Sequence, residues 1–147
     1  PSKLGSSAIM TIMDDGALYG VELQDSGANA RCYYTLAIPE NCVGVKRVWL
    51  YHGSDETLVA GQDDCKILAY SGGHDEAHDA VSDTLTTTTW ATTVADDINK
   101  LDVSAAFNTA ELIAPGSLLS WSIEKEEEET GGRDPNIFGW QFILECV

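Results

Sequence analysis

The chain has 147 residues, with 24 acidic and 8 basic residues, and therefore a formal net charge of −16 at pH 7. Hydrophobic residues make up 44% of it, enough apolar material to close one compact core, so it is not a disordered acidic tail. Eight scattered basic residues cannot displace counterions along a phosphate backbone, which excludes direct binding of nucleic acid. No apolar run approaches the roughly 20 residues that span a bilayer, so we expect a soluble chain.

The first half of the chain alternates apolar and polar residues, which is typical of half-buried β-strands. Strands are expected at residues 18–23 and 31–38, and shorter apolar strands at 45–51 and 66–70. The residues predicted to share an inward face are Tyr19, Val21 and Leu23, followed by Cys32, Tyr34, Leu36 and Ile38. The threonine-rich run 84–94 predicts a long strand, because β-branched residues fit a pleated surface better than a helix.

One short helix is predicted between residues 96 and 107. Aspartates at positions 96 and 97 can accept the unpaired amide hydrogens of a first helical turn and oppose the helix dipole. Ile98, Leu101 and Ala105 then fall three and four residues apart, which gives a short apolar stripe. We expect this helix to cross the edge of a β-sandwich.

Two alternating runs, 117–128 and 136–147, flank Gly131 and Gly132, so a long antiparallel hairpin is predicted. Its inward-facing aromatic residues are predicted to be Trp121, Phe138, Trp140 and Phe142. The predicted fold is all-β, a two-sheet antiparallel β-sandwich of the jelly-roll type with one short crossover helix.

The four cysteines are not spaced for a zinc ribbon, and a chain of this size does not need disulfides. Cys32 and Cys146 lie in alternating apolar runs, so we expect free, buried thiols there. The pairing state of all four cysteines, Cys32, Cys42, Cys65 and Cys146, stays open. Pro1 is what remains when an initiator Met is removed, and no apolar export signal follows it, which predicts synthesis in a cytoplasm without a signal peptide.

The best candidates for metal ligands are His74, Asp75, Glu76, His78 and Asp79. On a helix the two histidines would share one face, as a zinc site requires. Asp75 stands where a metalloprotease helix has Glu, however, and the preceding glycines favour a loop. A solvated acidic loop is therefore the favoured interpretation, with a bound calcium ion as the alternative.

Two further groups of acidic residues have the same two interpretations, a solvated surface or a calcium site. They are Asp55 and Glu56 with Asp63 and Asp64, and the glutamates 126–129 with Asp134. Neither has the alternation of an EF-hand loop, so a solvated surface is favoured over a calcium site. No other cofactor is expected.

Catalysis is not predicted, because the chain has no Gly-x-Ser-x-Gly elbow and no glycine-rich phosphate loop. Tyr51 and Trp90 are less clearly inward than the other aromatic residues, because each has a polar neighbour, His52 and Thr89 respectively. If these rings are exposed, they would suit sugar stacking or a subunit interface.

The order of the segments resembles that of small jelly-roll structural proteins on the virions of tailed bacteriophages, either capsid decoration proteins or tail appendages. It includes the strand ending at Pro39, the 45–51 strand, the threonine-rich strand and the final runs 117–128 and 138–142. The resemblance implies a non-enzymatic homo-oligomer, often a trimer, that is made in the host cytoplasm and joins other capsid or tail subunits on the virion. It also implies an N-terminal arm, residues 1–16, that docks onto a neighbour, and a jelly-roll domain, residues 17–147.

Two other classes stay open. A carbohydrate-binding module uses the same sandwich to present aromatic residues and calcium to a surface glycan. A self-assembling filament or tube subunit is the third class, since the apolar segment 8–13 could add a strand to the next subunit.

Overall fold

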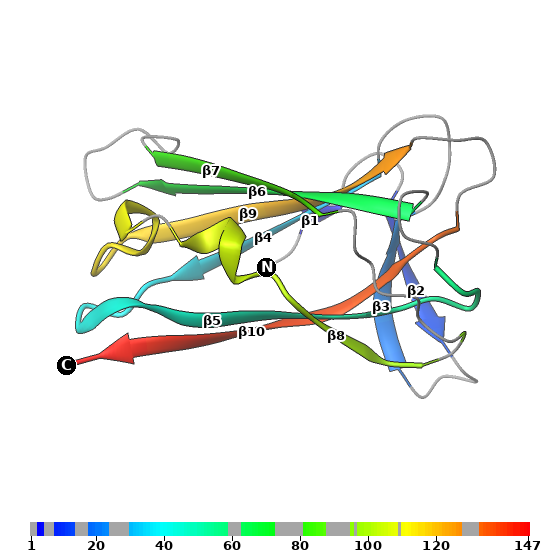
Figure 1. Ribbon diagram of the computed structural model, residues 1–147, viewed down its shortest axis with the longest axis horizontal. Helices are drawn as coiled ribbons and strands as arrows, with labels where there is room; N and C mark the ends of the chain where they lie inside the picture. Colours follow the sequence, from blue (N-terminus) through cyan, green and yellow to red (C-terminus); the bar gives the residue numbers. More distant parts are fainter. Residues whose placement is uncertain are drawn as a thin grey trace.

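The computed structural model describes residues 3–4, 8–13, 18–23, 30–58, 63–72, 81–87, 95, 97–108, 110–127 and 133–147. Two five-stranded antiparallel sheets pack face to face (Figure 1), which confirms the predicted β-sandwich. The strands are β1 (Lys3–Leu4), β2 (Ala8–Met13), β3 (Leu18–Leu23), β4 (Arg31–Ala37), β5 (Cys42–Gly53), β6 (Asp63–Gly72), β7 (Val81–Thr87), β8 (Asn99–Asp102), β9 (Leu118–Glu127) and β10 (Asn136–Cys146).

We call the two layers sheet A and sheet B. Sheet A has the order β1-β4-β9-β6-β7, and sheet B has the order β2-β3-β10-β5-β8. From β3 to β6 each connection passes to the other sheet, and so do those from β7 to β10. This alternation is the pattern of a jelly roll.

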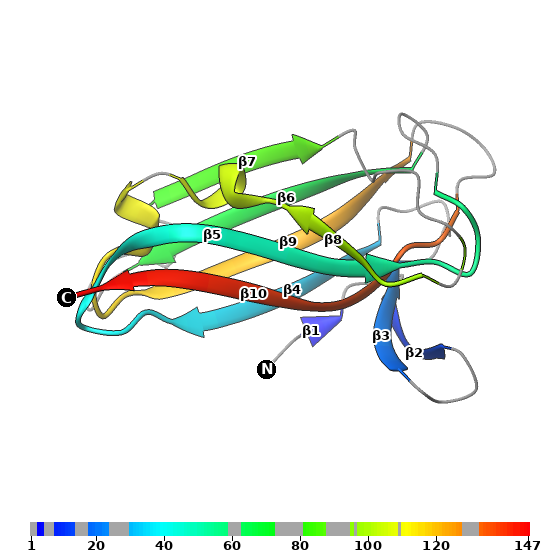
Figure 2. The same cartoon turned by 60° about the horizontal axis from the view of Figure 1, so that its bottom comes forward.

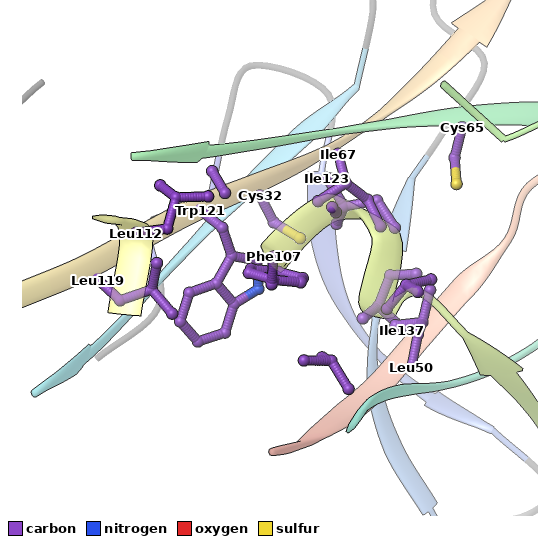
Figure 3. Close-up of a cluster of buried hydrophobic side chains, with 14 of the residues drawn as sticks. Cys32, Leu50, Cys65, Ile67, Phe107, Leu112, Leu119, Trp121, Ile123 and Ile137 are labelled. Atoms are coloured by element: carbon purple, nitrogen blue, oxygen red, sulfur yellow. The ribbon is translucent and has the colours of Figure 1, made fainter. Parts of the chain in front are cut away.

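The core lies between the sheets because alternate residues of each strand point inward. Cys32 and Ile38 are buried, and Tyr34 and Leu36 pack partly buried against the core, as the alternation predicts. Phe107 and Trp121 are the largest aromatic residues of the buried cluster in Figure 3. The aliphatic and cysteine side chains around them come from both sheets, including Leu50, Cys65, Ile67, Leu119, Ile123 and Ile137, and Leu112 comes from the segment 110–113.

The prediction of an α-helix between residues 96 and 107 is wrong over the first half of that range. Residues 99–102 form the edge strand β8, which pairs with β5 through Asn99↔His52 and Asp102↔Trp49. Alternation explains this, because Leu101 is more buried than its exposed neighbours Lys100 and Asp102. Among the described residues that follow, the helical segments are two short 3-10 helices, η2 (Ser104–Phe107) and η3 (Ala110–Ile113), and both contact strands of the two sheets.

The predicted hairpin between residues 117–128 and 136–147 is also wrong. Strand β9 lies in sheet A between β4 and β6, whereas β10 lies in sheet B between β3 and β5. The residues that join the two strands therefore cross from one sheet to the other. The inward direction predicted for Trp121 is correct, since its side chain is 5% exposed.

The segment 8–13, for which pairing with a neighbouring subunit was considered, pairs along its length with β3 of the same chain, from Ala8↔Leu23 to Met13↔Leu18. Figure 2 shows the β2–β3 pair projecting beyond the sandwich, and the ladder between β3 and β10 is short, with Val21 and Glu22 opposite Ile137 and Asn136. Strand β1 pairs with β4. The division into an arm and a domain stays a prediction.

All four cysteines are free. Cys32, Cys42 and Cys65 are buried, but Cys146 is exposed, which corrects the expectation for that residue. The register of β10 against β5 shifts between Glu145 and Cys146, so the alternation that predicted its burial is interrupted there. In the part of the chain that the structure describes, no helix has the length and apolar character needed to cross a bilayer.

Candidate functional site

The outer face of sheet A carries a hollow lined by residues of three neighbouring strands. It holds about 490 Å³, and its lining includes Tyr33 and Thr35 from β4, Ser120 and Ser122 from β9, and Tyr70 from β6. We call these five residues the sheet A groove. Each of them alternates with an inward-facing neighbour, so the same period of two that builds the core also builds the groove.

Strand pairing determines which residues lie opposite one another in the groove. Tyr33 lies opposite Ser122, and Ser122 lies opposite Leu68 on the next strand. One row further along, Thr35 lies opposite Ser120, and Ser120 lies opposite Tyr70. The two tyrosines therefore stand two strands apart, on either side of β9.

Strand β9, the middle of these three strands, forms the floor of the groove because its outward-facing residues there are serines, whose side chains are small. Ser122 is only 2% exposed, although it belongs to the outer face, which places it at the bottom of the hollow. The hydroxyl oxygens of Thr35 and Ser120 are 3.4 Å apart, within hydrogen-bonding distance. The floor is therefore lined with hydroxyl groups that can both donate and accept hydrogen bonds.

An ionic row lies two positions along the strands from Tyr33 and Ser122, where Arg31, Glu124 and Lys66 lie side by side on β4, β9 and β6. Arg31 donates a hydrogen bond to Glu124, whose residue is 6% exposed. Partial burial lowers the pKa of Arg31, but its hydrogen bonds with Tyr33 and Glu124 outweigh this effect and raise the pKa overall. The guanidinium thus stays charged and holds Tyr33 and Glu124 in place.

Such a groove can bind a molecule that presents both C–H surface and hydroxyl groups. The tyrosine rings offer apolar faces, and the serine and threonine hydroxyls offer hydrogen bonds. Among the described residues of the groove and its ionic row, Glu124 is the one carboxylate, and it is paired with Arg31. Hydrolysis of a glycosidic bond ordinarily needs two carboxylates, and these described residues supply one.

A second hollow of about 350 Å³ opens between the sheets beside β4 and β10. Its lining is mainly aromatic and apolar and comprises Tyr34, Thr35, Leu36, Trp121, Gly139, Trp140 and Phe142. Thr35, Tyr34 and Trp121 line both hollows, so the second adjoins the sheet A groove. Burial raises the pKa of the Tyr34 hydroxyl, which therefore stays neutral.

The residues predicted as metal ligands do not contribute to this site. His74, Asp75, Glu76, His78 and Asp79 lie outside the described residues, and so does Trp90. Within the described ranges, no three His, Cys, Asp or Glu residues come close enough to hold a metal ion. The calcium site stays a prediction.

Of the other acidic candidates, Asp134 and Glu56 form ion pairs. Asp134 accepts a hydrogen bond from the buried ammonium of Lys125 at 3.3 Å. Glu56 lies 3.6 Å from Arg133, and Asp55 beside it is exposed. The structure describes Asp63 and Asp64 only as backbone of β6, opposite residues 127 and 126 of β9. The interpretation as surface charge is the one that these contacts favour.

Sequence reasoning singled out none of the five groove residues. The alternation of residues 31–38 sends Tyr33 and Thr35 outward, and that of 117–128 does the same for Ser120 and Ser122. This signal was sufficient to place each residue on an outer face. It could not show that β9 lies between β4 and β6.

No known protein family and no curated protein sequence matches the chain. Solved structures do share its fold. The solution structure of the carbohydrate-binding module CtCBM11 matches 100% of this chain and 89% of its own, with 10% sequence identity and a TM-score of 0.53. A structure of carbohydrate-binding modules from the β-sandwich superfamily matches 97% of this chain and 56% of its own, with 8% identity and a TM-score of 0.54.

The enzymatically active domain of tailspike protein 4 from bacteriophage CBA120 also shares the fold. It matches 98% of this chain but only 19% of its own, with 10% identity and a TM-score of 0.55. Structural similarity therefore extends to a phage protein, without any match in sequence.

These comparisons correct the expectation of a virion structural subunit. All three structures share the fold over nearly the whole of this chain, but the match spans 89% and 56% of the two carbohydrate-binding structures and only 19% of the phage protein. The alternative of a carbohydrate-binding module is the better supported of the two.

Proposed function

We propose that this chain is a carbohydrate-binding module that holds an oligosaccharide in the sheet A groove. The observation that carries the proposal is the placement of Tyr33 and Tyr70 on either side of the serine floor of β9. The fold it shares with carbohydrate-binding modules supports the same conclusion.

The dimensions of the groove suit a sugar chain. Neighbouring strands lie about 4.8 Å apart, so the backbones that carry the two tyrosines are about 10 Å apart across β9. A pyranose ring can lie between them, with its C–H face against a tyrosine ring and its hydroxyls toward Ser120 and Ser122. Tyr33 is 39% exposed, so it keeps surface available for contact.

Tyr33 also interacts with a charged neighbour on its own strand. Its hydrogen bond with Arg31 links it to Glu124 on the floor strand. A side chain held in this way loses little conformational freedom on binding, which favours affinity. The proposed role is binding without cleavage.

The test is binding of the full chain to a panel of soluble neutral polysaccharides, measured by affinity electrophoresis and then by calorimetry with the best oligosaccharide. Tyr33→Ala and Tyr70→Ala should each weaken binding by about tenfold or more, since each removes one stacking wall. Tyr70→Phe keeps the ring and should retain most of the affinity. Ser122→Leu fills the floor and should abolish binding.

Val43→Ala is the control, because Val43 is also an exposed hydrophobic residue but lies on β5 in the other sheet. Circular dichroism confirms that each variant is folded. Binding that survives both Tyr33→Ala and Tyr70→Ala, or that fails equally with Val43→Ala, would refute the groove as the site.

A further inference from the structure

The outer face of sheet B carries a second group of aromatic and polar residues. Trp49 and Tyr51 point outward from β5, with Lys100 and Asp102 beside them on β8. On the other side, Gln141 of β10 lies opposite Trp49 and accepts a hydrogen bond from the Tyr51 hydroxyl at 3.0 Å. Both aromatic side chains are half-buried, so they keep exposed surface.

Two cations lie over these rings. The Lys100 ammonium is 4.3 Å from the ring centre of Trp49 and 5.4 Å from that of Tyr51. The Arg47 guanidinium is 5.1 Å from the ring centre of Trp49. Both distances to Trp49 are within the range of a cation–π interaction, so the rings hold the two positive charges close together.

The charges on this face are not fully balanced. Arg47 pairs with Asp102 at 3.5 Å, whereas Lys100 forms no ion pair with any residue that the structure describes. Arg47, Lys100 and Asp102 together therefore carry one net positive charge. This is unusual in a chain with 24 acidic and 8 basic residues.

We propose that the outer face of sheet B is a second binding site, for a saccharide chain that carries carboxylates, such as a chain of uronic acids. The ring of such a sugar has a C–H face that suits Trp49 and Tyr51, and its carboxylate suits Lys100 and Arg47. Gln141 can hydrogen-bond to the sugar hydroxyls.

Charge complementarity favours an acidic over a neutral ligand here. The net charge of −16 repels polyanions from most of the surface, so an acidic chain is favoured only where cations are concentrated. The site is separate from the sheet A groove, because the outer faces of the two layers point in opposite directions (Figure 1). The inference therefore does not depend on the proposed function of sheet A.

The test uses the full chain with polygalacturonate, and the fully methyl-esterified form of the same polymer as the neutral control. The chain should bind the acidic form more tightly, and added salt should weaken that binding because it screens the ion pairs. Lys100→Gln should weaken it by about tenfold, the effect of one lost charge-assisted contact. Trp49→Ala should weaken it further.

Lys66→Gln is the matched charge control, since it removes one positive charge from the outer face of sheet A. It should leave binding of polygalacturonate nearly unchanged. Lys100 is exposed, so its substitution is informative even if Trp49→Ala does not fold. Equal binding of the two polymers, or equal losses with Lys100→Gln and Lys66→Gln, would overturn the second site, whatever the sheet A groove binds.

Discussion

The indole rings of Trp121 and Trp140 meet across the two sheets, with their ring centres 5.6 Å apart and their planes at 76°. Each also makes an edge-on contact with Phe107. The two tryptophans come from strands of different sheets, so this contact helps to hold the sandwich together. The Trp121 indole nitrogen finds no hydrogen-bond acceptor among the described residues, which leaves ring packing as its main contribution.

Trp121→Ala should therefore cost about 3–5 kcal/mol of unfolding free energy, because it removes a large buried ring and leaves a cavity. Ser120→Ala, one position away on the outer face, should cost less than about 1 kcal/mol. Urea unfolding followed by circular dichroism measures both. Equal midpoints for the two variants would contradict the packing role of Trp121.

The turn before β9 gives a second prediction. Gly116 has φ of +72°, and a hydrogen bond from the Ser117 amide to the Ala114 carbonyl closes the turn at 3.1 Å. Pro115 and Gly116 thus fit the central positions of a type II turn, in which the second residue needs a positive φ. Gly116→Ala should lower the unfolding free energy by about 1–2 kcal/mol.

The matched control is Gly139→Ala. A Cβ at Gly139 would have no other atom within 4 Å, so the alanine should be neutral or stabilise the fold by up to about 1 kcal/mol. Thermal unfolding of the two variants compares them directly. If Gly139→Ala destabilised as much as Gly116→Ala, backbone strain would not explain the effect.

A third prediction concerns acid stability. Burial lowers the pKa of His52 from 6.5 to about 4. Between these values the unfolded chain binds more protons than the folded one, so stability rises with pH in this range. Acidification from about pH 7 to pH 5 should cost about 2 kcal/mol through this residue.

Urea unfolding of the native chain and of His52→Gln at both pH values isolates the contribution of His52, because all other titrating groups are common to the two proteins. The variant should lose less stability on acidification. The same loss in both would mean that His52 is not the group responsible.

The thiols give a fourth prediction. Burial raises the pKa of Cys32 to about 11, and Cys42 and Cys65 are buried as well, whereas Cys146 is exposed. A thiol reagent should therefore modify one cysteine rapidly in the folded chain and the other three only after unfolding. Mass spectrometry should locate the first modification at Cys146, and Cys146→Ser should remove it. Rapid modification of Cys32 would contradict the buried core.

The inward faces of single strands could be predicted from sequence, because period-two alternation is a local signal. It correctly placed Cys32 and Ile38 in the core and Trp121 between the sheets. The partners of each strand could not be predicted in the same way. β9 and β10 are consecutive and both alternate, yet they belong to different sheets, and no local pattern distinguishes a hairpin from a crossover.

The candidate site depends on these non-local pairings. Tyr33 and Tyr70 are 37 positions apart, and they flank one groove only because Ser120 and Ser122 enter between their strands. The acidic clusters are recognisable in the sequence because their charged residues are close together in it. The groove residues are dispersed over three strands, and each is ordinary in its own segment.

The strand order also determines when the chain can fold during synthesis. In sheet A, β4 and β6 are joined only through β9, and in sheet B, β3 and β5 are joined only through β10. Before residue 118 leaves the ribosome, both sheets consist of disconnected pairs such as β6–β7 and β5–β8. Folding can therefore be completed only after β10 has been synthesised. A chain that ends before β10 exposes unpaired apolar strands, which promotes aggregation.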